Sequence, residues 1–391
     1  MISSLSPTST TTTPANIVCV GMGWFPQTPG GLDRYVYELT HHLAAGNDRV
    51  ELCGVGLPEA PSDCAISLTN LAAPNSSLLQ RFWLTRRRFG QRQISTPDAI
   101  NLHFSLYSLP LLQSLPRNVP VTFTFHGPWA LESQHEGGGK LSQWLKAAIE
   151  QRVYQRCDRF IVLSKAFGKI LHQEYGIDWD QIHVIPGGVD IQRFQPSLSR
   201  QEARAQLNWH PDRPTLFTPR RLVQRMGLDQ LLRALVQVRE QVPDVWLAIA
   251  GKGGLRPALE QQVAELGLEN HVEFLGFMPD DQLPLAYQAA DLCVVPSQAL
   301  EGFGLILLES LACGTPALCT PVGGMPEVIS PFAPQLVTAS PESDALAERL
   351  IDALLAKIEV PSRAACRDYA VEQFDWQQIS QQVRSVLLQK T

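Results

Sequence analysis

The chain has 391 residues, of which 45% are hydrophobic and 18% are charged, and its formal net charge is −6. This length predicts two domains, and no run approaches the roughly 20 apolar residues of a membrane-spanning helix, which argues against an integral membrane protein. This negative net charge does not suggest a nucleic-acid binder, which carries a basic footprint, so we expect small-molecule partners and no nucleic acid.

The first fifteen residues are rich in Ser, Thr and Pro and lack the charged and apolar regions of a secretory signal, so residues 1–15 are predicted to be a disordered tail. Eight cysteines are scattered, mostly inside apolar runs: Cys19, Cys53, Cys64, Cys157, Cys293, Cys313, Cys319 and Cys366. Their spacing suits no metal site, so we interpret them as buried thiols of a cytoplasmic protein and expect no metal.

Strand and helix patterns alternate in the first half of the chain from Asn16 onward. Short apolar runs predict strands within 16–23, 49–56, 98–104, 119–127 and 159–166, and helical periodicity is seen in 32–45, 76–93 and 141–157. Such alternation is typical of βαβ units in a doubly wound parallel sheet.

A segment rich in Pro and Gly, residues 183–197, interrupts this alternation, and the plan then repeats. Strands are predicted within 215–221, 245–253, 272–278, 290–297 and 316–322, helices within 228–241, 255–267 and 303–314, and a final amphipathic helix in 374–389. We therefore expect two Rossmann-like domains, 16–186 and 187–373, facing across a cleft, together with a C-terminal helix, 374–391.

Ligands of open parallel sheets bind beyond the carboxyl ends of the strands, where helix N-termini present free N–H groups. Gly30 and Gly31 follow the first strand and open the first helix, so a phosphate or sugar could approach their backbone, although a plain turn explains them equally well. A dinucleotide fingerprint is not completed, because Pro26 and Arg256 occupy the places of its third glycine.

Arg220, Arg221 and Arg225 follow the first strand of the second half. Guanidinium groups beside a helix N-terminus suit a diphosphate, since each donates two hydrogen bonds and stays charged, whereas the plainer interpretation is a solvated basic turn.

Two glutamates are separated by seven intervening residues in EGFGLILLE, where Glu301 precedes a predicted helix and Glu309 lies within it. A carboxylate can accept two hydroxyls of a ribose or hexose, and an idle carboxylate among leucines is rare. His126 ends a strand and could bind a substrate hydroxyl or act as a base, although its position alone favours a structural role. His103 has a similar position and a weaker case.

The basic segment 77–93 interleaves arginines with aromatic residues. Arg86, Arg87 and Arg88 could bind an acceptor phosphate or the inner face of an anionic membrane, and an exposed helix packed on its own domain is the alternative.

Taken in order, these motifs resemble those of glycosyltransferase family four, the retaining GT-B enzymes of the group 1 glycosyl transferases. The resemblance rests on PGGLDRYVYEL, TFHG, VIPGGVDIQRF, RRLVQRMG, IAGKG, VEFLGFM, EGFGLILLE and ACGTPALCTPVGGMPEVI, and it covers almost the whole chain from Asn16. It implies transfer of a hexose from a UDP-, GDP- or ADP-linked donor to a hydroxyl acceptor, without a further cofactor, in glycan or glycolipid biosynthesis.

The resemblance also implies roles for individual residues. Glu309 would bind the ribose, Glu301 and His126 would lie near the transferred sugar, and Arg221 would contact the diphosphate. The donor-binding residues implied by the matched motifs are Gly30, Gly31, Arg221, Arg225, Gly276, Phe277, Met278, Glu301, Phe303, Gly304, Leu305 and Glu309. The final helix would pack back on the first domain.

The chain departs from the family pattern at Met226, where a phosphate-binding lysine is usual, and Arg225 is expected to supply the missing charge. Two alternatives to a retaining hexosyltransferase stay open. One is a sugar-nucleotide epimerase of the same fold, and the other is a nucleotide-sugar-binding protein that has lost turnover.

Overall fold

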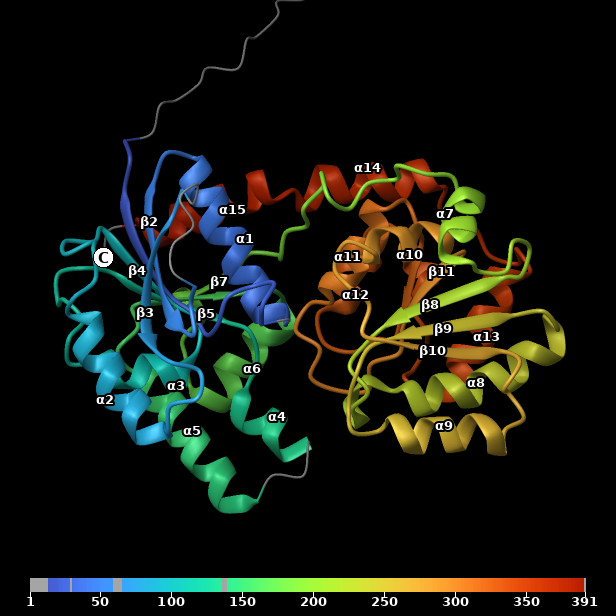
Figure 1. Cartoon of the computed structure of the whole chain (residues 1–391), viewed down its shortest axis with the longest axis horizontal. Helices are drawn as coiled ribbons and strands as arrows, with labels where there is room; N and C mark the ends of the chain where they lie inside the picture. Colours follow the sequence, from blue (N-terminus) through green and yellow to red (C-terminus); the bar gives the residue numbers. More distant parts are fainter. Residues whose placement is uncertain (1–12, 29, 59–64, 136–138, 390–391) are drawn as a thin grey trace, which may run out of the picture.

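The computed structural model describes residues 13–28, 30–58, 65–135 and 139–389 and contains two parallel-sheet α/β domains (Figure 1). The first sheet has seven parallel strands in the order β3-β2-β1-β4-β5-β6-β7. Their bounds are β1 Asn16–Val20, β2 Arg49–Val55, β3 Ser67–Ala72, β4 Ala99–Leu102, β5 Val121–Phe125, β6 Arg159–Val162 and β7 Ile182–Val184.

The second sheet has five parallel strands in the order β10-β9-β8-β11-β12. Their bounds are β8 Thr215–Pro219, β9 Trp246–Ala250, β10 Val272–Gly276, β11 Leu292–Val295 and β12 Ala317–Cys319. In both sheets the chain reverses direction across the sheet after the third strand, so β1 and β4, and likewise β8 and β11, flank a topological switch point where ligands of such sheets bind.

Helices cover both domains. Those of the first half are α1 Gly31–Ala45, α2 Leu78–Phe89, α3 Ser105–Ser108, α4 Trp129–His135, α5 Lys140–Tyr154 and α6 Lys165–Tyr175. Those of the second half are α7 Arg200–Leu207, α8 Leu228–Gln241, α9 Arg256–Glu265, α10 Leu283–Ala289, α11 Leu305–Ala312, α12 Met325–Ile329, α13 Ser343–Leu354, α14 Arg363–Phe374 and α15 Trp376–Leu387.

The expected doubly wound, two-domain architecture is confirmed, but two strands of the first sheet were not predicted. Strand β3 is partly exposed along most of its length and lies at the sheet edge, so its sequence lacks a continuous apolar run. Strand β7 has three residues and lies at the other edge, directly before the Pro and Gly of the connecting segment. Edge strands with little burial give a weak sequence signal.

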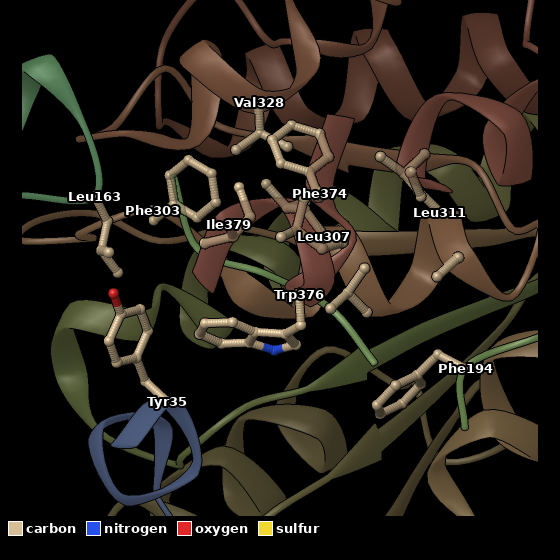
Figure 2. Packing of buried hydrophobic residues seen from close by; sticks show 14 of the residues in the cluster. Tyr35, Leu163, Phe194, Phe303, Leu307, Leu311, Val328, Phe374, Trp376 and Ile379 are labelled. Carbon is tan, nitrogen blue, oxygen red and sulfur yellow. The ribbon is translucent and has the colours of Figure 1, made fainter. Parts of the chain in front are cut away.

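The connecting segment and the last two helices join the domains. Val189 donates its N–H to the carbonyl of Phe374 at 2.8 Å, and Figure 2 shows Trp376 beside Tyr35 of α1. A Cβ on Gly188 would lie 2.5 Å from the Trp376 ring, so the close contact requires glycine. One continuous apolar cluster, which includes Tyr35, Trp376 and Leu307, therefore runs from one domain to the other.

Helix α15 packs on α1 of the first domain. Arg384 of α15 pairs with the buried carboxylate of Asp48 at 2.7 Å and donates to the carbonyl of Thr13 at 2.9 Å. The predicted tail lies mostly outside the described residues, but Ala15, its last residue, is buried and donates its N–H to Asp48 at 2.9 Å. The domain boundary near residue 186 and the assignment of 374–391 to the first domain stay proposals.

Seven of the eight cysteines are described, and all seven are buried free thiols. Cys64 lies outside the described residues. Burial raises the pKa of these thiols, as for Cys19 to about 12, so they pack as small apolar side chains. Within the described ranges no helix is long and apolar enough to cross a membrane.

Candidate active site

A charged cluster lies at the switch point of the second sheet. Arg220, directly after β8, donates from Nη2 to the Ser297 hydroxyl and the Glu301 carboxylate, both beyond the end of β11. The Ser297 hydroxyl also donates to Glu301 Oε2 at 3.2 Å. Burial would raise the pKa of Glu301, but Arg220, then Arg225 and Ser297, outweigh it and bring the pKa below its usual value. Glu301 is therefore an ionised, firmly oriented acceptor.

Arg225 lies beside the same loop, in a short 3-10 helix over Gln224–Met226. It is 8% exposed, and its Nη1 donates to the carbonyl of Leu300 at 3.1 Å. Its Nη2 lies 3.5 Å from Glu132 Oε1 of α4 in the first domain. Met226 is buried and uncharged, and the adjacent Arg225 carries a positive charge.

Glu132 was not predicted. It lies six residues after His126, and a Cβ on Gly127 would lie 2.9 Å from its carboxylate. Glu132 thus places an acidic charge opposite Arg225, which is expected to face the donor diphosphate. The only sequence signal for Glu132 was its closeness to the TFHG motif.

Arg221 lies in a different environment from the adjacent Arg220. Its side chain is exposed, whereas Arg220 is the arginine that joins Glu301. Successive residues beyond a strand point in different directions, so adjacency in RRL did not decide which arginine would pair.

The N-terminus of α11 begins at Gly304, whose φ of 86° is in the left-handed region that glycine adopts without strain. No described side chain caps this helix end. The Phe303 side chain is buried, with its ring centroid 6.0 Å from that of Phe374 (Figure 2). Leu305 packs toward Gly187. Because the Phe303 side chain is buried, Phe303 could meet a ligand only through backbone atoms, whereas the Leu305 side chain is partly exposed.

Glu309 lies farther along α11 and is 6% exposed. Its Oε1 pairs with Arg34 of α1 at 2.6 Å, and its Oε2 accepts from the Tyr287 hydroxyl at 2.8 Å. The expectation that this carboxylate is not idle among leucines fits these contacts. Its partner, however, is an arginine from the first domain, 275 residues away.

In the first domain, Gly30 and Gly31 are exposed at the start of α1, and a Cβ on Gly31 would meet no atom within 4 Å. Asp33 orients the preceding loop by accepting the Gly23 N–H at 2.8 Å.

His126 and His103 follow neighbouring strands, and His103 Nδ1 lies 3.1 Å from His126 Nε2. Burial lowers the pKa of His126 to about 3, so its imidazole is neutral at pH 7.

The segment Gly276–Met278 lies at the carboxyl end of β10, where the Gly276 carbonyl accepts the Gly251 N–H at 2.6 Å. Phe277 is 50% exposed, with Lys252 Nζ 5.1 Å from its ring centroid, and Met278 packs on the domain core. An exposed aromatic ring at a strand end offers a flat surface on which a base could stack.

Helix α2 carries the basic residues of segment 77–93, and its N-terminus has a capping box formed by Ser77 and Gln80. Arg86 and Arg87 are exposed, with Arg87 stacked 5.3 Å from the Trp83 ring centroid, whereas Arg88 donates to the Asn70 carbonyl at 3.1 Å. Large apolar side chains of α2 face outward: Leu78, Leu79, Phe82 and Trp83 are 68%, 86%, 45% and 58% exposed. Among the described residues, no group of three or more His, Cys, Asp or Glu side chains is placed to hold a metal ion.

The two parallel-sheet α/β domains are those of the GT-B class of glycosyltransferases, and comparisons with known proteins agree. The family model described as glycosyl transferases group 1 matches residues 199–387, and that of glycosyltransferase family 4 matches residues 29–193. Together the two matched ranges include most of the chain, and the protein belongs to this family of GT-B glycosyltransferases.

Among curated relatives, the chain is 34% identical over 203 residues to a GDP-mannose-dependent alpha-(1-6)-phosphatidylinositol monomannoside mannosyltransferase of Mycolicibacterium smegmatis, covering 49% of this chain and 52% of the relative. It is 32% identical over 240 residues to a D-inositol 3-phosphate glycosyltransferase of Nocardia farcinica, covering 59% and 53%. The aligned part thus spans about half the length of these relatives.

Solved structures share the fold over nearly their whole length. A sucrose-phosphate synthase from Thermosynechococcus elongatus gives a TM-score of 0.75 at 23% identity, covering 95% of this chain and 98% of that one. Anabaena Alr3699/HepE in complex with UDP-glucose gives a TM-score of 0.75 at 22% identity, covering 95% and 99%. At such identities the likeness concerns the fold.

Proposed function

We propose that the protein transfers a hexose from a nucleoside-diphosphate sugar to a hydroxyl acceptor, with retention at the anomeric carbon. The observation that carries the proposal is the Arg220–Glu301 pair beside Arg225, at the switch point of the second sheet and next to the uncapped N-terminus of α11. Because two relatives are described as a GDP-mannose-dependent enzyme and an inositol-phosphate glycosyltransferase, GDP-mannose is the first donor to test.

The charges of the cluster suggest a division of roles. Arg220 is already neutralised by Glu301, so the diphosphate would be stabilised by the exposed Arg221, by Arg225 and by the free N–H groups at the start of α11. The loose 3.5 Å contact of Arg225 with Glu132 would give way to the phosphate. Charge stabilisation of this kind assists departure of the nucleotide as the glycosidic bond breaks.

Glu301 would orient the sugar and would not attack it. Its carboxylate is ionised, but Arg220 and Ser297 already occupy one of its oxygens, and the second remains able to accept a sugar hydroxyl. This arrangement supports attack of the acceptor hydroxyl on the face from which the nucleotide leaves, with the leaving phosphate receiving the acceptor's proton.

A donor panel tests the proposal. GDP-mannose, UDP-glucose and ADP-glucose are compared by thermal shift, since a ligand that binds the folded state raises its apparent stability. Hydrolysis and transfer are then followed with the donor that binds. Release of an epimer with free nucleotide, in the absence of acceptor, would favour an epimerase, and tight binding without turnover would favour a binding protein.

We also propose peripheral contact of α2 with an anionic membrane, on whose inner face a lipid-linked acceptor would lie. Exposed apolar residues beside Arg86 and Arg87 support this proposal. Co-sedimentation with vesicles of anionic lipid should be lost when Arg86 and Arg87 are changed to Glu, whereas Arg239→Glu, in α8 of the other domain, should leave it unchanged. A parent protein that ignores these vesicles would refute the contact.

A further inference from the structure

Two histidines form a hydrogen-bonded pair at the carboxyl ends of two central strands of the first sheet. Strands β4 and β5 are parallel neighbours, with Leu102 opposite Phe123, and His103 and His126 each follow directly after a strand. Their rings meet through His103 Nδ1 and His126 Nε2 at 3.1 Å, with only 28° between the ring planes. This nearly coplanar arrangement suits a hydrogen bond that lies in both rings.

The surroundings fix the two rings unequally. His103 is 1% exposed, and its backbone N–H donates to the carbonyl of Val20 at 3.0 Å. His126 is partly exposed, and the edge of its ring meets the Tyr35 ring at a centroid distance of 4.9 Å and an angle of 73°. Tyr35 in turn packs on Trp376 at 5.1 Å, beside the connection between the domains (Figure 2). His103 is therefore the buried support, and His126 is the ring that a substrate can reach.

Protonation of the pair is restricted by burial. Burial lowers the pKa of both imidazoles, and charge repulsion from the His126 ring lowers the pKa of His103 further, so both rings are neutral at pH 7. Each ring then carries one N–H, and one of these two protons lies in the shared hydrogen bond. The position of the second proton decides what His126 offers to a ligand.

The remaining nitrogen of His103 indicates where that proton lies. His103 Nε2 is buried and has no hydrogen-bond partner among the described residues. Buried N–H groups without a partner are rarer than unpaired acceptors, so Nε2 is better left unprotonated. His103 then carries its proton on Nδ1 and donates it to His126 Nε2, which leaves the proton of His126 on Nδ1.

We propose that His103 is a positioning residue that fixes His126 as its Nδ1–H tautomer, so that His126 presents a neutral hydrogen-bond donor to an oxygen of the bound donor sugar. The identity of that ligand rests on the proposed function, whereas the tautomer does not. Of the two roles open for His126 from the sequence, hydrogen bonding to substrate and base catalysis, this pairing selects the first, because a ring protonated on its accessible nitrogen cannot accept a proton there.

Nitrogen-15 NMR of the histidine side chains at pH 7 tests the proposal on the ligand-free protein. His126 signals, assigned by their loss in His126→Gln, are expected to report one fixed tautomer with the proton on Nδ1. His103→Leu removes the donor and should leave an exchanging mixture, whereas His103→Asn, whose amide can donate to His126 Nε2, should restore the Nδ1–H form. A proton on Nε2 of His126 in the parent protein would overturn the proposal, and so would an unchanged tautomer in His103→Leu.

A binding measurement connects the tautomer to the donor. Loss of one neutral hydrogen bond should weaken binding of the preferred nucleotide sugar about three- to tenfold in His103→Leu, with binding of the free nucleotide unchanged and most of the loss recovered in His103→Asn. Equal weakening of nucleotide and nucleotide-sugar binding would contradict a role at the sugar. If no nucleotide sugar binds the parent protein, the proposed function fails, and the NMR result still decides the tautomer.

Discussion

The ion pair between Arg34 and Glu309 joins helix α1 of the first domain to helix α11 of the second and is largely withdrawn from water. The exposed fractions of the two side chains are 14% and 7%, and the oxygen–nitrogen distance is 2.6 Å. Arg34 also lies over the Phe25 and Phe194 rings, with its guanidinium carbon 5.3 Å and 4.9 Å from their centroids. Its removal therefore tests how strongly the two domains are held together.

Arg34→Met keeps an unbranched side chain against the two rings and removes the charge. Glu309 would then retain only the Tyr287 hydroxyl as a described partner, and a buried charge that loses its counter-ion costs about 3–5 kcal/mol. We expect the free energy of unfolding, measured by urea denaturation with tryptophan fluorescence, to fall by about 3 kcal/mol. In Arg34→Met/Glu309→Gln both charges are absent, so much of this loss should be recovered.

Arg256→Met is the matched control, because Arg256 and Glu260 form an exposed pair on one helix at 2.7 Å. Such surface pairs contribute about 0.2–1 kcal/mol. If Arg34→Met costs no more than this control, the pair between the domains does not stabilise the protein and the reasoning is refuted. Donor binding tests the second role of Glu309, the ribose contact that the family resemblance implies. Donor binding that is weakened in Glu309→Gln but not in Arg34→Met would support this contact.

Three further predictions concern charged residues near the site. Arg225→Ala should weaken binding of the preferred donor about tenfold or more, whereas unchanged kinetics would show that Arg225 does not replace the lysine absent at position 226. Burial, and after it the charge of Asp190, raises the pKa of Glu38 to about 7. Because this pKa exceeds that of the unfolded state, the free energy of unfolding should fall as the pH rises from about 5 to 8. Glu38→Gln should remove that slope, as measured by urea unfolding at a series of pH values. Arg220→Met should raise the pKa of Glu301, because the Arg220 charge lowers it. In the parent protein this lowered pKa contributes stability that is lost only when the pH becomes acidic. A pH–stability profile of the variant identical to the parent's would contradict this reasoning.

Sequence reasoning located the central strands of both sheets and the edge strands β10 and β12 of the second sheet, but it missed the edge strands β3 and β7 of the first sheet. Strands β5 and β9 are buried along their whole length, and their sequences are a β-branched and aromatic run, VTFTF, and a continuous apolar run, WLAIA. Strand β3 and strand β7 are not buried along their whole length, because an edge strand can leave part of its surface in water. The start of α11 near Gly304 was predictable, since a glycine before an apolar helical run marks such a boundary.

Side-chain partners were harder to predict than positions. Glu301 and Arg225 lie close to each other, as their places after β11 and β8 indicated, because strands that neighbour each other in a parallel sheet end at the same edge. The choice of Arg220 over Arg221 as the partner of Glu301 depends on the direction of each side chain beyond the strand. Residue spacing along the chain carries no information on that direction.

The sequence by itself determined the two-domain parallel architecture, the family, and the loops that carry the charged residues, because these follow from local periodicity and motif spacing. Only the tertiary structure decided that Glu309 meets Arg34, that Arg225 faces Glu132, and that His103 supports His126. Each of these contacts joins residues from different elements, and two of them join different domains. Their existence depends on how the sheets and helices pack in three dimensions, which residue order along the chain does not specify.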